Sequence, residues 1–134
     1  IEADPGIMDC PCPKLIVQPL VENALIHGLE PKKMNGNIWI LFKRNDDKIM
    51  IRVSDDGAGF TEKSKNANPY EKSGYGLANI NERLRMLYGG KCKVELARRD
   101  GGGVTASICL PGNIREEHHV SYDSRGRAVY PGRD

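Results

Sequence analysis

The sequence lacks the features that mark membrane-spanning and nucleic-acid-binding proteins. No run approaches the roughly 18 consecutive apolar residues that are needed to cross a bilayer. The 20 basic and 18 acidic residues are well mixed along the chain and leave a formal net charge of +2. No basic stripe indicates nucleic acid as a partner, so any anionic ligand must be bound by a local site.

The four cysteines do not have the pattern of a disulfide-stapled or zinc-binding domain. No signal peptide precedes them, and their spacing is not that of a disulfide framework, so we expect a reducing, cytoplasmic setting. Cys10 and Cys12 could be combined with His118 and His119 as zinc ligands, but a Cys-x-Cys pair lacks the usual gap of two to four residues. We therefore expect these cysteines to be small core or surface residues.

Length and hydrophobic periodicity predict one folded domain with a poorly ordered tail. A chain of 134 residues with 39% hydrophobic residues is large enough to build one core. Residues 1–111 are expected to form the domain. Residues 112–134 are rich in charge, glycine and histidine and show no period, as is typical of a disordered extension.

The order of the predicted elements indicates an α+β fold. The pattern predicts an extended segment over 1–14, a helix over 15–25 that Gly28 and Pro31 stop, strands over 38–43 and 49–55, a helix over 74–88, and strands over 91–98 and 104–110. Helix, two strands, helix, two strands implies a two-layer α/β sandwich. We expect a mixed, mostly antiparallel sheet with the helices on one face.

The most informative stretch lies where the second predicted strand ends. Ile49, Ile51 and Val53 alternate with other residues, which predicts one buried face, and the run Asp55-Asp56-Gly57-Ala58-Gly59 follows at once. Glycine permits a positive φ and the close approach of another molecule, and a carboxylate there can accept a hydrogen bond from an exocyclic amine such as that of adenine. Because Asp-Gly is also a common hairpin signal, the stretch by itself favours a turn.

Three further stretches carry polar or glycine-rich patterns. Residues 61–73 are polar and rich in helix breakers, and a loop this long in a compact domain more often serves as a functional lid than as a simple connection. It leads into Gly74-Tyr75-Gly76-Leu77, and the free N–H groups at the start of a helix favour anions. On the first helix, Glu22, Asn23 and His27 lie near the edge of the apolar stripe, where polar residues are usually just solvated.

Three features are combined here: Glu22-Asn23 on the first helix, the run from Asp55 to Gly59 at a strand end, and Gly74 and Gly76 at the start of the second helix. In this order and spacing they resemble the Bergerat-type (GHKL) ATP-binding fold of sensor histidine kinases, gyrase, the Hsp90 chaperone and mismatch-repair ATPases. The stretches Gln18–Gly28 and Gly76–Leu84 resemble more narrowly the LytS/YesM-type sensor histidine kinases. The resemblance covers about residues 1–111.

The resemblance implies roles for residues on the first helix and the first pair of strands. Asn23 matches the asparagine that coordinates magnesium, and Glu22 before it would orient a metal-bound water; both are candidate catalytic residues. Asp55 matches the acid that receives the adenine amino group, and Gly57 and Gly59 match the first glycine box. Asp56 is expected to be a solvated neighbour.

The second glycine box belongs to the implied ATP site, and at two positions the sequence departs from the family pattern. Gly74-Tyr75-Gly76-Leu77 would face the phosphates, and residues 61–73 would be the ATP lid. The family's Lys or Arg three residues after the asparagine is Ile26 here, so His27 is its candidate substitute. Where the family has Gly-Thr at the last strand, this chain has Gly103-Val104, so the candidate hydroxyl is that of Thr105. Asn79 and Arg83 also match the second signature.

The function implied by the resemblance is that of the ATP-binding catalytic domain of a two-component sensor histidine kinase. Such a domain uses ATP and Mg²⁺ and presents the γ-phosphate to a histidine on a separate dimerisation domain, with a response regulator as an indirect partner. The whole protein would be a membrane-anchored bacterial homodimer with this domain in the cytoplasm. His27, His118 and His119 have no context of a phospho-acceptor.

Two other functions remain open from the sequence. A gyrase- or chaperone-type ATPase would need a base one turn before Asn23, where this chain has Pro19. A degenerate nucleotide-sensing module is the third possibility, because Ile26 and Val104 depart from the family pattern.

Overall fold

The computed structural model describes residues 1–10, 12–59, 74–112, 121–122 and 128–129. Its elements in chain order are β1 (Glu2–Ala3), the 3-10 turn η1 (Ile7–Asp9), α1 (Val17–Asn23), the π-helical segment η2 (Ala24–Leu29), the 3-10 turn η3 (Glu30–Lys32), β2 (Ile38–Asn45), β3 (Lys48–Asp55), α3 (Gly74–Tyr88), β4 (Val94–Arg98), β5 (Val104–Pro111), β6 (Ser121–Tyr122) and β7 (Ala128–Val129).

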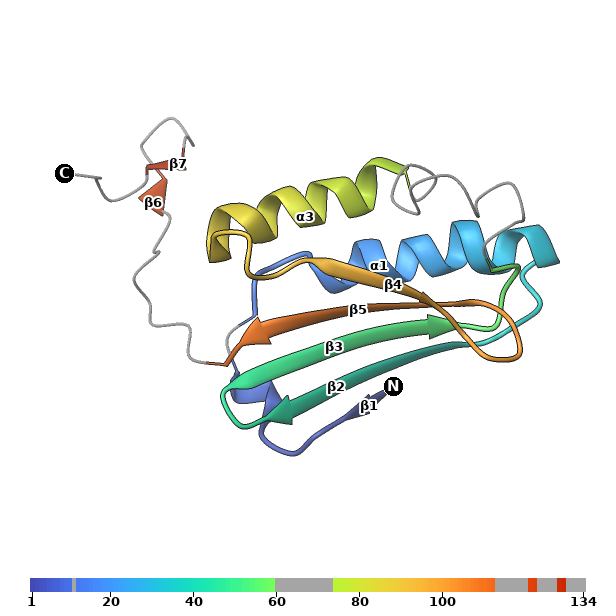
Figure 1. The fold of residues 1–134 in the computed structure, drawn as a ribbon, viewed down its shortest axis with the longest axis horizontal. Coiled ribbons are helices and arrows are strands. Elements are labelled where there is room, and N and C mark those ends of the chain that lie inside the picture. Colours follow the sequence, from blue (N-terminus) through green and yellow to red (C-terminus); the bar gives the residue numbers. More distant parts are fainter. Residues whose placement is uncertain (11, 60–73, 113–120, 123–127, 130–134) are drawn as a thin grey trace.

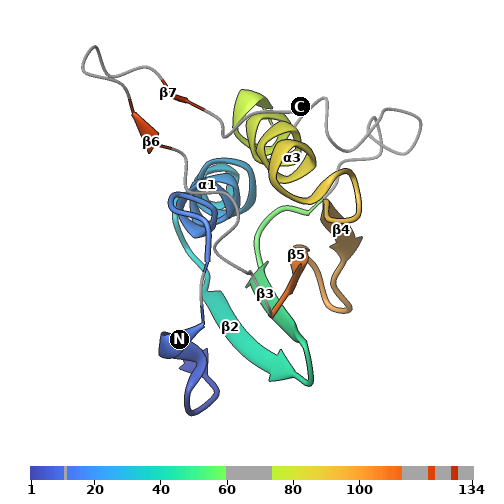
Figure 2. The same ribbon diagram turned by 90° about the vertical axis from the view of Figure 1, so that its left-hand side faces the viewer.

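Five strands form a mixed sheet in the order β1-β2-β3-β5-β4. β1 runs parallel to β2, whereas the β2–β3, β3–β5 and β4–β5 pairs are antiparallel. Helices α1 and α3 lie side by side on one face of this sheet, and the other face is open (Figures 1 and 2). The predicted α+β two-layer sandwich, with a mostly antiparallel sheet and helices on one face, is confirmed.

The core lies between the helices and the central strands β3 and β5. The predicted alternation in β3 is confirmed, because Ile49, Ile51 and Val53 are each at most 3% exposed. They pair across the ladder with three buried residues of β5, namely Leu110, Ile108 and Ala106. Full burial of a large aliphatic side chain stabilises a fold by about 1.5–3 kcal/mol, so this ladder fixes the position of Asp55 at the end of β3.

The first helix continues further than the sequence predicts. Gly28 does not stop it, because the chain passes through the π-helical η2 into η3 and leaves the helical region only at Lys33, where φ is 55°. Pro31 is tolerated in the first turn of η3. Gly28 is buried inside η2, and its missing side chain makes room for the carboxylate of Asp55. This tertiary contact overrides the usual role of glycine as a helix stop.

The strand predicted over 91–98 is shorter than expected, because β4 begins at Val94 rather than at residue 91. Further along the chain, β6 and β7 pair as a small antiparallel sheet.

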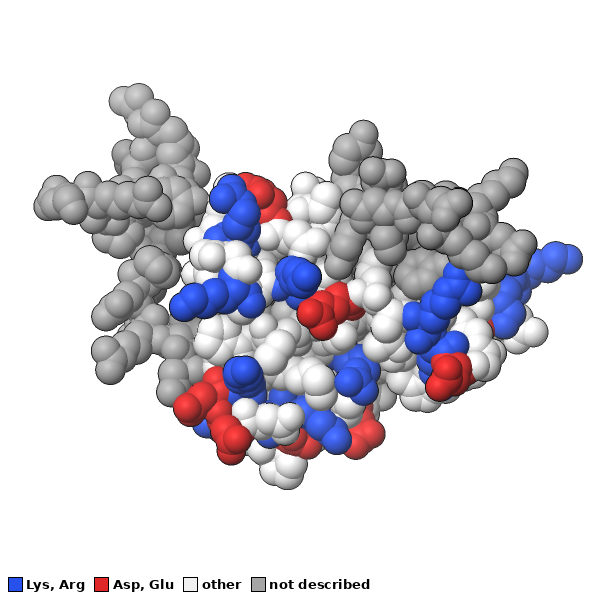
Figure 3. All heavy atoms as spheres, in the orientation of Figure 1, with Lys and Arg blue, Asp and Glu red and all other residues white. Residues whose placement is uncertain are grey.

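The described residues include no helix suited to a bilayer, and their surface carries charges of both signs. None of the helices among these residues is both long and apolar enough to cross a membrane. Acidic and basic side chains are interspersed on the face shown in Figure 3.

Candidate functional site

Asp55 is the only buried charged residue in the described part of the chain, with 3% of its surface exposed. It ends β3, and its Oδ1 accepts a hydrogen bond from the backbone N–H of Gly57 at 2.9 Å. The backbone N–H of Val104, at the start of β5, also donates to this carboxyl group. A carboxylate has about four acceptor positions, so Asp55 keeps capacity for a donor from a ligand.

Burial raises the pKa of Asp55 above its ordinary value of 3.8, since removal from water disfavours the charged form. The N–H groups of Gly57 and Val104 act in the opposite direction. Among the nearby charges, that of Asp56 raises the pKa and that of Arg99 lowers it. The carboxylate is thus poorly solvated, and a ligand that donates a hydrogen bond to it would offset part of that cost.

Glycines from three segments enclose Asp55. A Cβ on Gly28 would lie 2.6 Å from Oδ1 of Asp55, a Cβ on Gly57 would overlap the carbonyl group of Gly28, and a Cβ on Gly103 would overlap the carbonyl oxygen of Asp55. The backbone N–H of Ala58 donates to the Gly28 carbonyl at 2.8 Å. The close approach predicted for Gly57 is therefore to η2 of the same chain.

The predicted positive φ occurs at only one of the two glycines of the first box. Gly59 has a φ of 68°, whereas Gly57 is not among the residues with positive φ. Gly59 also packs against the loop after β4, because a Cβ there would lie 3.3 Å from the backbone nitrogen of Gly103.

Asp56 is partly exposed, as the expectation of a solvated neighbour implies, but it also makes specific hydrogen bonds. Its Oδ1 accepts the backbone N–H of Asn37 at 2.6 Å, and its Oδ2 accepts the Asn37 side-chain amide at 3.0 Å. These bonds lower the pKa of Asp56. Lys32 adds a hydrogen bond from Nζ to the Asp56 carbonyl oxygen at 2.8 Å. Asp56 thus anchors the loop between η3 and β2 beside the Asp55 corner.

Asn23 is the last residue of α1 and carries a buried oxygen without a partner. Its Oδ1 has no hydrogen-bond partner among the described residues. An unpaired buried oxygen is costly, and a neutral oxygen is a suitable ligand for Mg²⁺, so the residue fits the metal that the resemblance implies. Glu22 is exposed and accepts a hydrogen bond from Gln18 Nε2 at 2.8 Å, while His27 is exposed on η2.

The first turn of α3 lies beside α1. Gly76 is exposed, and a Cβ there would be 3.8 Å from the Cβ of Pro19. Leu77 is fully buried in the core, so only its backbone can face a ligand. The side chain of Tyr75 and the predicted lid at 61–73 lie outside the described residues.

The rest of the second signature divides into surface and structural residues. Asn79 and Arg83 are exposed. Asn81, to which the sequence assigns no role, accepts the backbone N–H of Val94 on its Oδ1 at 2.7 Å and so holds β4 against α3.

Thr105 is not brought together with Asp55. Its hydroxyl lies 2.9 Å from that of Ser54, the residue opposite it on β3. Because consecutive side chains of a strand point to opposite faces, Ser54 and Thr105 face the open side of the sheet, whereas Asp55 faces the helices. Thr105 therefore does not supply the hydroxyl that was expected near the acid.

Comparison with known proteins supplies the context of this arrangement. The family model described as histidine kinase-, DNA gyrase B-, and HSP90-like ATPase matches residues 11–114. Sensor histidine kinase YpdA of Escherichia coli is 36% identical over 85 residues, which cover 61% of this chain and 15% of that protein. Sensor protein LytS of Oceanobacillus iheyensis is 33% identical over 116 residues, which cover 81% of this chain and 20% of that protein.

A solved structure agrees in fold. The blue-light activated histidine kinase of Erythrobacter litoralis superposes with a TM-score of 0.54 at 18% identity, over 75% of this chain and 29% of that one. The chain spans only 15–20% of the length of the two curated relatives.

Proposed function

The chain belongs to the histidine kinase-, DNA gyrase B-, and HSP90-like ATPase family, and from this we propose that it is the ATP-binding catalytic domain of a two-component sensor histidine kinase. The names of the YpdA and LytS relatives support the kinase branch of the family. We assign residues 1–111 to the domain and 112–134 to a C-terminal tail.

The observation that carries the proposal is the buried carboxylate at the end of β3. Asp55 is enclosed by Gly28 and Gly57 and is fixed by backbone N–H groups. In this proposal the adenine amino group donates to its free acceptor positions. Because the carboxylate is desolvated, a ligand without this donor leaves a buried charge uncompensated, which gives selectivity for adenine.

The phosphates are proposed to lie between the end of α1 and the start of α3. Asn23 would hold Mg²⁺ through its unpartnered Oδ1, and bound magnesium would neutralise phosphate charge. The first N–H groups of α3, from Gly74 to Leu77, would face the phosphates, since they have no partner within the helix. Glu22 and His27, both exposed near this region, are proposed to contact the metal-bound water and a phosphate.

The phospho-acceptor is proposed to be a histidine on a separate dimerisation domain of the same kinase. His27 lies on η2, the segment next to the proposed nucleotide site, which is not the place of a phospho-acceptor. His118 and His119 lie outside the described residues. We propose that the whole protein is a membrane-anchored bacterial homodimer whose phosphoryl group passes on to a response regulator. Alone, the domain would bind ATP and transfer little phosphate.

Calorimetric titration with Mg-ATP tests the proposal. We expect the wild-type domain to bind, and Asp55→Asn to weaken binding by about 1–3 kcal/mol, the scale of a hydrogen bond to a buried charged group. The matched control is Asp46→Asn, because Asp46 is exposed in the β2–β3 hairpin and its φ of 48° suits asparagine.

Three outcomes would contradict parts of this proposal. No binding at millimolar nucleotide would exclude an ATP site. Equal affinities of wild type and Asp55→Asn would show that the adenine contact is misplaced. Rapid hydrolysis of ATP by the isolated chain would favour the ATPase alternative over the kinase domain.

A further inference from the structure

A contact between a cation and an aromatic ring crosses the open face of the sheet behind the Asp55 corner. The guanidinium carbon of Arg99 lies 4.0 Å from the centre of the Trp39 ring. Trp39 is on β2 and Arg99 follows β4, and two strands, β3 and β5, separate these strands in the sheet. The contact therefore holds the β4–β5 loop against β2, across two strands on the same face of the sheet.

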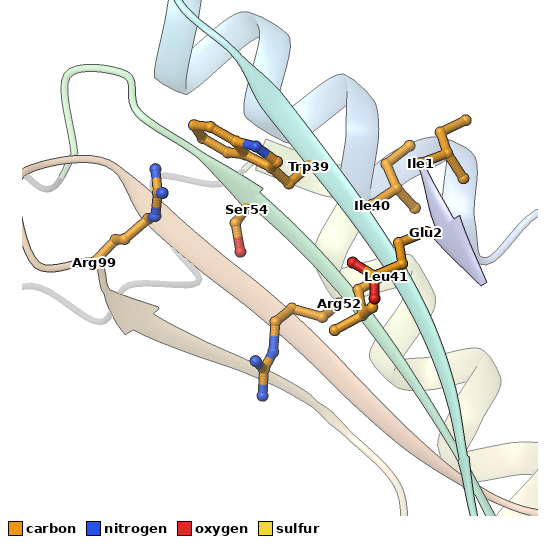
Figure 4. A pocket seen from close by; sticks show the side chains of 8 residues that line it. All are labelled: Ile1, Glu2, Trp39, Ile40, Leu41, Arg52, Ser54 and Arg99. Carbon is orange, nitrogen blue, oxygen red and sulfur yellow. The ribbon is translucent and has the colours of Figure 1, made fainter. Parts of the chain in front are cut away.

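The two side chains border a cavity of about 430 Å³ on this face, together with Ser54 and Arg52. Figure 4 shows the Arg99 side chain directed toward the Trp39 ring at one end of this cavity. Arg99 is half-buried, and 43% of the Trp39 surface is exposed. The ring can therefore respond to changes in the position of Arg99.

The loop that begins at Arg99 forms one wall of the Asp55 corner. It is closed by a hydrogen bond from the backbone N–H of Arg99 to the carbonyl oxygen of Gly103 at 3.2 Å. Gly103 packs directly on the backbone of Asp55. The next residue, Val104, donates its N–H to the Asp55 carboxyl group. Two backbone contacts therefore connect the Arg99 loop to the carboxylate.

We propose that Arg99 and Trp39 are positioning residues that hold the 99–103 loop against Asp55 and so couple the open face of the sheet to nucleotide affinity. The inference rests on the proposed ATP site and adds a mechanism for tuning it. The charge of Arg99 also favours the ionised form of Asp55, which is the form that accepts a hydrogen bond from adenine. A ligand or domain that drew Arg99 away from Trp39 would loosen the corner.

Trp39 is the single tryptophan of the chain, so its fluorescence reports on this contact. We expect Arg99→Ala to change the emission of the nucleotide-free protein and to lower the affinity for Mg-ATP about three- to tenfold, the scale of a cation–π contact. Arg99→Lys keeps a cation and should recover most of the affinity. Arg85→Ala removes an exposed arginine that pairs with Glu82 on α3 and, as the control, should change neither quantity.

Trp39→Leu separates the ring contact from the charge of Arg99, with affinity measured by calorimetry. If the ring holds the loop, this variant should lose affinity by a factor similar to that of Arg99→Ala. A loss confined to Arg99→Ala would assign the effect to charge alone and overturn the positioning role of the pair.

Amide hydrogen exchange in the absence of nucleotide gives a second measurement that does not depend on ATP binding. We expect faster exchange at the Val104 and Gly57 amides in Arg99→Ala and in Trp39→Leu than in the wild type, without a comparable change in β2 or α3. Unchanged exchange in folded variants would overturn the inference. A wild-type protein that fails to bind ATP would overturn the proposed function instead, and the exchange data would still decide the role of Arg99 and Trp39.

Discussion

Replacing Gly28 by alanine should damage the Asp55 corner even though alanine is the better helix former. A Cβ at position 28 would lie 2.6 Å from Oδ1, 2.7 Å from Cγ and 3.2 Å from Oδ2 of Asp55. The carboxylate cannot simply rotate away, because Oδ1 is held by the N–H of Gly57 at 2.9 Å. The segment η2 cannot retreat freely either, because the Gly28 carbonyl accepts the N–H of Ala58 at 2.8 Å.

The size of the effect follows from the bond that has to break. Losing one hydrogen bond to a charged group costs about 1.5–3 kcal/mol, whereas glycine to alanine in a helix gains up to about 1 kcal/mol. We therefore expect Gly28→Ala to lower the free energy of unfolding by about 1–2 kcal/mol and to weaken ATP binding about tenfold.

Urea denaturation in two backgrounds tests this reasoning. In Asp55→Ala the carboxylate is absent, and the three atoms nearest the added Cβ all belong to that carboxylate, so Gly28→Ala should become neutral or stabilising by up to about 1 kcal/mol. This reversal of sign is specific to the proposed clash. An equal loss of stability in both backgrounds would refute the idea that alanine acts through the carboxylate.

Three further predictions concern groups whose environments the structure defines. Burial raises the pKa of Asp55 in the folded state, so its contribution to stability is complete below its ordinary pKa and is lost as the pH rises through the raised pKa. The free energy of unfolding of the wild type should therefore fall with pH between these two pKa values. In Asp55→Asn this fall should be smaller, as pH-dependent urea titrations would show. Asn81→Ala should lower the free energy of unfolding by about 0.5–1.5 kcal/mol, because the hydrogen bond from the N–H of Val94 to Asn81 is lost, whereas the exposed control Asn79→Ala should stay within about 0.5 kcal/mol of wild type. Burial raises the pKa of Tyr88 to about 12, so alkaline absorbance titration of the wild type should show a tyrosine ionisation near pH 12 that Tyr88→Phe lacks; a titration that keeps this step in the variant would contradict the assignment.

The fold was predictable where a local pattern decides the structure. The period of two in β3 reflects one buried face, and the structure buries Ile49, Ile51 and Val53 as predicted. The position of Asp55 at the end of that strand follows from the same alternation, because it continues the buried face. The glycine-led start of α3 at Gly74 was also visible in the sequence.

Other features depend on contacts between distant segments, which one sequence does not show. Thr105 is close to the expected position in the chain, but the pairing of β3 with β5 decides that its hydroxyl faces Ser54 on the open side. Leu77 lies within a glycine-rich motif, yet the packing of α3 buries its side chain. Asn37 and Lys32 gave no signal because their common partner, Asp56, follows a different strand.

The π-helical segment explains how one helix can serve both ends of the proposed nucleotide site. In η2 the N–H of Glu30 donates to the carbonyl oxygen of Leu25, five residues earlier. A helix with bonds of this span has more residues per turn, so residues five apart lie closer to one face of it than they do in an α-helix. Asn23, with its unpartnered oxygen, immediately precedes η2, and Gly28, which packs against Asp55, lies five residues later within it. Because residues five apart lie far from each other around a regular α-helix, we expect the departure from α geometry after Asn23 to bring the metal-binding candidate and the wall of the proposed adenine corner toward the same ligand.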